Sequence, residues 1–574
     1  MPATLAGSHP PRQFMNASFA NPIEMQHLLF AELSRMFGQE VPLYDKSLLV
    51  NRVCNQTVGT LLGKKYAGFH LSEEQLNRTS GERHGAIRVG KPSEYRWVAG
   101  FFAAFGLEPH NFYDMTNLGG KSQPVIATAF RSPLNPEHRV FTSLLMTDYF
   151  DPETRKRIEA LLAPREIFSA RAQELVLKNQ RAGGLSRADA TELIREGTTR
   201  IFKWTGQARD HRLYQELSQA GFKIAADVAC FASHHLNHLT PNTFCMDLYT
   251  AAMKFCLGQL TAEIFVRRAR AVLEFLSGFA DRDWMKLHFK HLTCAEIESY
   301  SVEPVSDGTI AGLVSAITQR LRQPDLALGQ LNHSGFKDFT EGPPADTPIL
   351  LRQDSYKALT EPVKFCEADG TTVDTVHTAR FGEIEQRFYA TTPKGRALYD
   401  ECLAIAEKMR EAEPELIKRD YDGYQIAYAK SFAAFPKTLP ALLEQELVYA
   451  RYAATARGVA AAKARSITTT DLAELTRLGY LQAEGLRYED FLPFSAAGIF
   501  ASNLGQYGTK STAAAKPVYR QEVLEDIMGR KIIDPNVAYH GRQAESVAKV
   551  YSELGLAQGI NSTEKDWPQL AARE

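Results

Sequence analysis

Two side chains that could do chemistry, His84 and Arg88, lie close together in the segment ERHGAIRVG, residues 82–90. If this segment is a β-strand, its side chains alternate between two faces, so His84, Ala86 and Arg88 point the same way. An imidazole can bind a metal ion, and the planar guanidinium of an arginine matches a carboxylate. The pair fits a metal ligand beside a clamp for an anionic substrate. A structural core histidine next to a surface arginine is the alternative interpretation.

A second segment, ASHHLNHLTPNT, brings His234, His235 and His238 together just before Pro241. Histidines this close in sequence can supply metal ligands. One or two of them can equally serve only to stabilise a turn.

A third segment, HTARFGEIEQR, contains two glutamates that are two positions apart. Strand alternation places Glu383 and Glu385 on one face, together with Phe381 and Arg387. Carboxylates on such a face can be solvated, but buried ones need a metal ion or another cation.

Two histidines and one carboxylate from separate strands would form a facial triad, which leaves adjacent positions of an octahedral Fe(II) open. A 2-oxo acid can use two of these positions through its carboxylate and keto oxygens, and O2 can use the last. Zn(II) with a bound water suits the same ligands in metallohydrolases. Spacing alone does not choose between them.

The elements that must position these residues follow from the pattern of apolar side chains, which predicts an α+β protein. The ordered part is expected to begin near residue 22 with a helix. A helix is also expected from Pro393 onward, with Thr392 as its N-cap. Further helices are expected over 94–106, across 151–220 and 244–335, and as one long helix over 439–465. Strands are expected over 125–132, 138–150, 223–232, 348–359, 363–368 and 378–391.

Changes in composition divide the chain into five parts. The division predicts a loose N-terminal extension (1–23), a first part of the catalytic domain (24–243) and a mainly helical insertion (244–339). A second part of the catalytic domain (340–552) and a C-terminal tail (553–574) follow. The histidines of the helical block, His288, His291 and His333, are interpreted as structural.

Bulk composition narrows the class of protein. A formal net charge of −1 and a pI near 7.0 give no field that would recruit nucleic acid or an anionic membrane. The seven cysteines are dispersed and form no CxxC pair, as is typical of reduced thiols in the cytoplasm. No secretory signal and no membrane span is expected, and the oligomeric state stays open.

Several long motifs together resemble one family. ERHGAIRVG, HLNHLTPNT, EGPPADTPILLRQDSYKALTEPVKF, HTARFGEIEQRFYATTPKGRALYD and YEDFLPFSAAGIFASNLG are similar to those of the 2-oxoadipate dioxygenase/decarboxylase family. The resemblance covers roughly residues 24–243 and 340–552. It implies a vicinal oxygen chelate-like core, a mixed or antiparallel sheet enclosing a metal site, with surrounding helices. It also implies a cytoplasmic Fe(II) enzyme of lysine degradation that converts 2-oxoadipate and O2 to D-2-hydroxyglutarate and CO2.

The resemblance also assigns roles to individual residues. His84, His238 and Glu385 would hold the iron, with Glu383 as the alternative to Glu385. Arg88 would bind a substrate carboxylate, and the main chain around Phe494 and Ser495 would contact the far carboxylate. Two other functions stay open: a zinc-dependent hydrolase or isomerase on the same fold, and a non-catalytic binding module.

Overall fold

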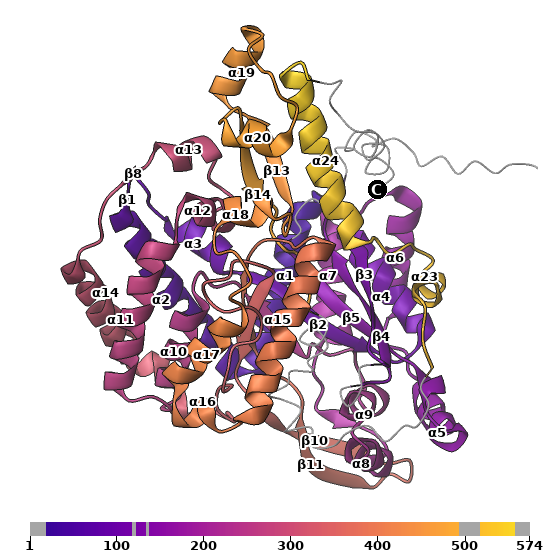
Figure 1. Ribbon diagram of the computed structural model, residues 1–574. Helices are drawn as coiled ribbons and strands as arrows, with labels where there is room; N and C mark the ends of the chain where they lie inside the picture. The colour runs from indigo at the N-terminus through magenta and orange to yellow at the C-terminus, as the bar shows by residue number, and fades with distance from the viewer. Residues whose placement is uncertain (1–18, 118–121, 134–136, 493–516, 557–574) are drawn as a thin grey trace, which may run out of the picture.

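The computed structural model describes residues 19–117, 122–133, 137–492 and 517–556 of the chain. Helices and several β-sheets are mixed along it, so the predicted α+β class is confirmed (Figure 1). No helix within these ranges is both long and apolar enough to cross a membrane.

A five-stranded sheet forms the centre of the fold, in the order β3-β4-β5-β2-β7. Its strands are β2 (Glu82–Val89), β3 (Glu108–Asp114), β4 (Val125–Arg131), β5 (Arg139–Leu145) and β7 (His238–Pro241). Strand β2 is parallel to β5 and antiparallel to β7. The ERHGAIRVG segment therefore forms a strand, and the strands predicted at β4 and β5 are confirmed.

A two-stranded sheet, β9 (Leu351–Ser355) with β12 (Glu383–Arg387), extends this sheet at the β7 edge. Just beyond β7, Asn242 forms a parallel bridge to Glu385, and the Thr243 amide donates to the Glu385 carbonyl at 2.8 Å. Strands β2, β7 and β12 consequently lie next to one another, although they are far apart in the sequence.

Helices cover the central sheet on both faces. The helices before β5 and shortly after it are α1 (Pro22–Glu40), α2 (Pro42–Lys65), α3 (Glu73–Ser80), α4 (Pro92–Ala104), α5 (Pro152–Leu162), α6 (Ala170–Ala182), α7 (Arg187–Glu196), α8 (His211–Gln219) and α9 (Lys223–Cys230). Asn21 caps α1, so the ordered start predicted near residue 22 is confirmed. Ile87 and Val89 of β2 pack in the core on the side of α1 and α4. Ala86 packs in a second cluster with residues of α5 and α9.

Residues 244–339 contain the helices α10 (Met246–Cys256), α11 (Ala262–Phe279), α12 (Arg282–His288), α13 (Cys294–Ser299) and α14 (Asp307–Leu321). Helices α11 and α14 lie side by side and both contact α2 (Figure 1). Their buried side chains belong to the same core as those of α1 and α4. The mainly helical character predicted for this block is confirmed.

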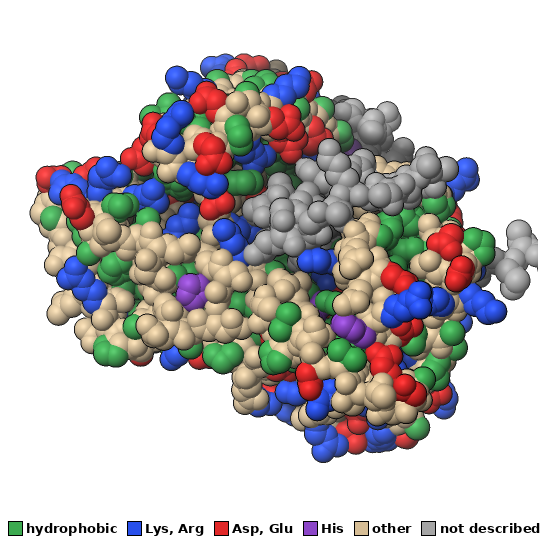
Figure 2. All heavy atoms as spheres, turned by 90° about the horizontal axis from the view of Figure 1, so that it is seen from below, with side chains coloured by type: hydrophobic (Ala, Val, Ile, Leu, Met, Phe, Trp, Pro, Cys, Tyr) green, Lys and Arg blue, Asp and Glu red, His purple; other side chains and the backbone are tan. Residues whose placement is uncertain are grey.

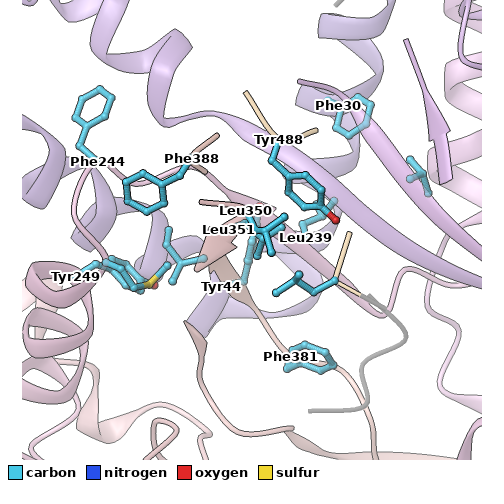
Figure 3. Close-up of a cluster of buried hydrophobic side chains, with 14 of the residues drawn as sticks. Phe30, Tyr44, Leu239, Phe244, Tyr249, Leu350, Leu351, Phe381, Phe388 and Tyr488 are labelled. Atoms are coloured by element: carbon cyan, nitrogen blue, oxygen red, sulfur yellow. The ribbon is translucent and has the colours of Figure 1, made fainter. Parts of the chain in front are cut away.

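Part of this core lies behind the strands that extend the sheet. Leu239 of β7, Leu351 of β9 and the flanking Leu350, Phe381 and Phe388 pack in it with Tyr488 (Figure 3). Leu239 follows His238 and therefore faces away from it. Leu239 thus belongs to an apolar core on the face of β7 opposite to His238.

The remaining elements complete the fold. They are β1 (Tyr66–Ala67), β6 (Gln207–Ala208), β8 (Ser301–Val302), β10 (Thr360–Cys366), β11 (Thr372–Thr378), α15 (Pro393–Ala412), α16 (Leu416–Arg419), α17 (Tyr421–Ser431), α18 (Leu439–Glu444), β13 (Ala450–Ala454), α19 (Ala456–Lys463), α20 (Leu472–Arg477), β14 (Leu481–Gly485), α23 (Gln521–Met528) and α24 (Pro535–Glu553). Thr392 caps α15 as predicted, and its hydroxyl accepts from the Gly395 amide. The hairpin β10–β11 lies close to α8 and α9 (Figure 1).

Two sequence predictions were wrong. Residues 223–230 form α9 rather than a strand, because alanines at 225, 226 and 229 favour a helix and the segment is buried all round. The long helix predicted over 439–465 is broken into α18, β13 and α19. Glu446 has a φ of 56°, a left-handed conformation that ends α18 and turns the chain into β13.

Candidate metal centre

Three buried donors converge at the junction of β2, β7 and β12. His84, His238 and Glu383 each offer one atom, and these atoms all lie within 4.8 Å of one another. The Glu383 Oε2 atom lies 3.2 Å from His84 Nε2 and 3.6 Å from His238 Nε2. Ligand bonds of about 2.1 Å place neighbouring donors about 3 Å apart, so this spacing suits one metal ion.

The pairing of β2 with β7 explains why the histidines meet. His238 is opposite Ala86, and His84 is opposite Thr240. The small Ala86 side chain leaves room for the His238 ring beside it. Gly85 has the same function on the other face, because a Cβ at this position would lie 2.9 Å from the Leu239 side chain.

Neighbouring polar groups hold the Glu383 carboxylate. The Thr240 hydroxyl donates to Glu383 Oε2 at 3.1 Å, and the Gln353 side-chain amide donates to the same atom at 3.4 Å. Three buried atoms have no hydrogen-bond partner among the described residues. They are the two ring nitrogens of His238 and Oε1 of Glu383. Buried polar atoms without partners are costly, and a bound cation would satisfy one nitrogen of His238 and the Glu383 carboxylate.

Electrostatics keeps two of the three donors, His238 and Glu383, in their metal-binding forms. Burial lowers the pKa of His238 to about 4, which leaves this imidazole neutral at pH 7. Burial alone would raise the pKa of Glu383, but His238 and His84 lower it, so the group is a carboxylate. Two imidazoles and one carboxylate are a suitable ligand set for Fe(II) or Zn(II).

Glu385, the expected ligand, has a different environment, and the glutamate that converges with His84 and His238 is Glu383, the alternative. Arg387 donates to both Glu385 oxygens, at 2.7 and 2.8 Å, and Arg139 lies 3.6 Å away. Burial opposes the charge, but Arg387, His84 and Arg139 hold the pKa of Glu385 well below its usual range. Its carboxylate is therefore committed to cations and does not join the three donors.

Glu385 nevertheless contacts the centre through His84. Its Oε2 atom lies 2.8 Å from Nδ1 of His84, the ring nitrogen that does not face Glu383. Carboxylates in this position fix the orientation and tautomer of metal-binding histidines. Glu385 thus lies behind one of the three donors.

Arg88 lies on the same face of β2 as His84, as the alternation predicted. Its Nη1 atom donates to Asp227 Oδ2 of α9 at 2.6 Å, and its side chain is 10% exposed. A guanidinium has five N–H donors, so this bond leaves capacity for an anionic ligand.

The three clustered histidines separate in the fold. His238 belongs to the metal centre, His235 faces Asp227 at 3.2 Å, and His234 faces Glu94 at 3.6 Å. Asp227 was missed in the sequence because it lies in a segment of small apolar residues that was predicted to be a strand. The sequence pattern did not indicate that Asp227 lies on a helix packed against β2.

Apolar rings border the centre. Phe491 packs edge-on against His84, with ring centroids 4.8 Å apart, and Phe381 stacks on His238 at 4.9 Å. Phe494 and Ser495, expected at the far carboxylate, lie outside the described residues. The rings that are described would limit the access of water to the metal ligands.

The histidines of the helical block lie apart from these donors. His288 is buried, and its Nδ1 atom contacts the Trp284 carbonyl at 2.9 Å. His333 accepts a hydrogen bond from the Gly335 amide at 3.1 Å. Neither they nor His291 join the group of three, in line with the structural interpretation.

On the face shown in Figure 2, the described residues form no large surface patch of a single charge. Lysine and arginine side chains are interspersed there with aspartate and glutamate. This mixture agrees with the near-zero net charge.

Comparison with known proteins identifies relatives along nearly the whole chain. A family model described as 2-oxoadipate dioxygenase/decarboxylase matches residues 29–264 and 257–503. A 2-oxoadipate dioxygenase/decarboxylase of Pseudomonas putida is 33% identical over 94% of this chain and 98% of its own length. One from Escherichia coli is 31% identical over 91% of this chain and 97% of its own length.

Two solved structures also align with nearly the whole chain. The hydroxyglutarate synthase of Pseudomonas putida, in complex with 2-oxoadipate, aligns with a TM-score of 0.64 and 31% identity, over 94% of this chain and 100% of that one. An uncharacterized protein of Shigella flexneri aligns with a TM-score of 0.63 and 27% identity, over 93% of this chain and 99% of that one.

Proposed function

Because the chain belongs to the 2-oxoadipate dioxygenase/decarboxylase family, we propose that it converts 2-oxoadipate and O2 to D-2-hydroxyglutarate and CO2 at an Fe(II) centre. The observation that supports this most directly is the buried group of His84, His238 and Glu383 with Arg88 on the same face of β2. We further propose that the sheet is a vicinal oxygen chelate-like core, that residues 244–339 are an insertion in it, and that the enzyme serves lysine degradation in the cytoplasm.

The proposed ligands are His84, His238 and Glu383. When bound, Fe(II) would supply the centre that activates O2, and three protein ligands leave positions for a 2-oxo acid and O2. A carboxylate of the substrate needs a cation in the protein, and Arg88 is that cation. The solved relative in complex with 2-oxoadipate supports this choice of substrate.

The reaction balances without another reactant. One carboxyl group of 2-oxoadipate leaves as CO2, and the former keto carbon becomes a carboxylate. One oxygen atom of O2 enters that carboxylate, and the other becomes the hydroxyl group on the adjacent carbon. Six carbons thus become five plus CO2, and the substrate itself supplies the electrons that reduce O2.

The protein contributes binding, orientation and exclusion of water. Glu385 orients the His84 ring, and Arg387 holds Glu385 in place. Phe491 and Phe381 shield the ligands from solvent, which protects a reactive centre from side reactions.

The direct test is oxygen uptake by the Fe(II)-loaded protein after addition of 2-oxoadipate, with the product identified by mass. We expect one 2-hydroxyglutarate for each O2 consumed, with both atoms of labelled O2 in that product. The Zn(II)-loaded protein serves as the control and should consume no O2. Turnover of 2-oxoadipate by the Zn(II) form under argon would instead support a hydrolase or isomerase. Absence of uptake with iron in the site would refute 2-oxoadipate as the substrate.

A further inference from the structure

A buried carboxylate that the proposed reaction does not use lies directly behind Arg88. We propose that Asp227 is a positioning residue, which holds the Arg88 guanidinium in the orientation that receives the substrate carboxylate. This inference rests on the substrate-binding role proposed above for Arg88.

The two oxygens of Asp227 have different partners. Oδ2 accepts from Arg88 Nη1 at 2.6 Å, the short distance typical of a charge-assisted hydrogen bond. Oδ1 faces the Nε2 atoms of His235 and His377, at 3.2 and 3.4 Å. One oxygen therefore bonds to the arginine, while the other faces two imidazoles.

The imidazoles are themselves fixed. The Tyr214 hydroxyl lies 2.7 Å from Nδ1 of His377, so the ring of His377 is held between this hydroxyl and Asp227. The Trp204 ring packs against His235 edge-on at 4.6 Å and against His377 face-on at 5.9 Å. The Asp227 carboxylate is therefore restrained by its surroundings, and its hydrogen bond in turn restrains the Arg88 side chain.

Four segments build this support, and two of them, β2 and β11, are distant in sequence from the other two. They are β2, α9, the loop before β7, and β11. Asp227 is 1% exposed and His377 is 2% exposed. Burial of an aspartate costs free energy unless it is paired, and burial strengthens each pairing that is made. His377 lies on a strand whose other residues are exposed or half-buried, so its burial is specific to this contact.

The consequence for the reaction concerns the orientation of a long side chain. An unrestrained arginine has many rotamers, and each binding event would have to select one. With Nη1 held by Asp227, the remaining N–H donors point in fixed directions. Asp227 lies on the Arg88 side of the site and is not one of the three metal donors, so its loss should spare the metal.

The test compares Asp227→Asn, Arg88→Ala and the double variant with the wild type. Binding of 2-oxoadipate to the iron-loaded proteins is measured by calorimetry under argon, and KM, kcat and iron content are measured separately. We expect Asp227→Asn to raise Kd and KM about tenfold or more, with a smaller change in kcat and unchanged iron content. In the Arg88→Ala background, the same substitution should change Kd less than twofold, because Asp227 acts through Arg88.

Two further variants make the outcome decisive. Asp247→Asn is the matched control, because Asp247 forms an ion pair with a different arginine, Arg352, at 2.8 Å. Asp247 is not one of the three donors, and its replacement should leave Kd unchanged. Tyr214→Phe removes only the outer support of His377 and should raise Kd by a few fold, which keeps the test valid if Asp227→Asn does not fold.

Equal effects of Asp227→Asn with and without Arg88, or an unchanged Kd in both Asp227→Asn and Tyr214→Phe, would overturn the inference. Failure of the proposed function is distinguishable, because it would show as loss of O2 uptake in the wild type itself. Binding of 2-oxoadipate under argon does not depend on that uptake.

Discussion

Replacement of each of the two neighbouring glutamates by glutamine should separate a metal ligand from its support. Glu383→Gln removes the anionic donor from the group with His84 and His238. Glu385→Gln removes instead the carboxylate between Arg387 and the back of His84. We expect the first variant to lose its iron on dialysis and keep its fold, and the second to keep most of its iron but lose stability.

The magnitudes follow from the partners of each carboxylate. Glu385 pairs with buried arginines, and removal of one partner of a buried ion pair costs about 3–5 kcal/mol. Arg387 also donates to the carbonyls of Tyr488 and Asp490, and Arg139 retains Glu489 at 2.8 Å, so the lower end, about 3 kcal/mol, is expected.

For Glu383, the hydrogen bonds lost come from Thr240, Gln353 and the His84 ring, and the cost to the metal-free protein should be about 1 kcal/mol. Loss of the support from Glu385 should weaken iron binding by about 10- to 100-fold, as is typical of groups behind a metal ligand.

Two measurements on each variant test this reasoning. Urea unfolding of the metal-free proteins gives the change in the free energy of unfolding, and metal analysis after dialysis at a fixed free Fe(II) concentration gives occupancy. Loss of iron in Glu385→Gln with retention in Glu383→Gln would refute the assignment and restore Glu385 as the ligand. Equal destabilisation of both metal-free variants would refute the electrostatic argument.

Three further changes have defined outcomes. Gly85→Ala places a Cβ 2.9 Å from the Leu239 side chain, so we expect about 1–3 kcal/mol of destabilisation by urea unfolding, together with lower iron content. Burial lowers the pKa of His288 to about 3, below its unfolded value near 6.5, so its contribution to stability is complete above about pH 6.5 and is lost as the pH falls toward 3. His288→Gln should therefore make stability fall less steeply over this window, by up to about 1.4 kcal/mol per pH unit in urea titrations; an unchanged slope would show that His288 is protonated in the fold. Thr392→Ala removes the cap of α15 and should cost about 1 kcal/mol without affecting iron binding, and a loss of iron would contradict its distance from the site.

Local sequence patterns were sufficient for several parts of the fold. Alternation along a strand over residues 82–90 predicted that His84 and Arg88 share one face, and both lie there. Thr392 followed by Pro393 predicted the start of α15. These features depend only on neighbours in the chain, so they can be recognised without knowledge of the tertiary structure.

The choice between Glu383 and Glu385 could not be made in this way. Both glutamates share a strand face, and what separates them is the position of Arg139 on β5 and of Thr240 on β7. Those partners are brought near by strand pairing over long sequence distances. Asp227 was overlooked for the same reason, because its partners on β2 and β11 become neighbours only in the folded chain.

The placement of the three donors on adjacent strands has a kinetic consequence. More than a hundred residues separate His84 from His238, and again His238 from Glu383, so two long loops must close before the donors meet. Such distant pairings form slowly, and a partly folded chain has at most isolated donors with weak affinity. Tight iron uptake during refolding would therefore report completion of the sheet from β2 to β12, and its rate would follow the slowest of these strand pairings.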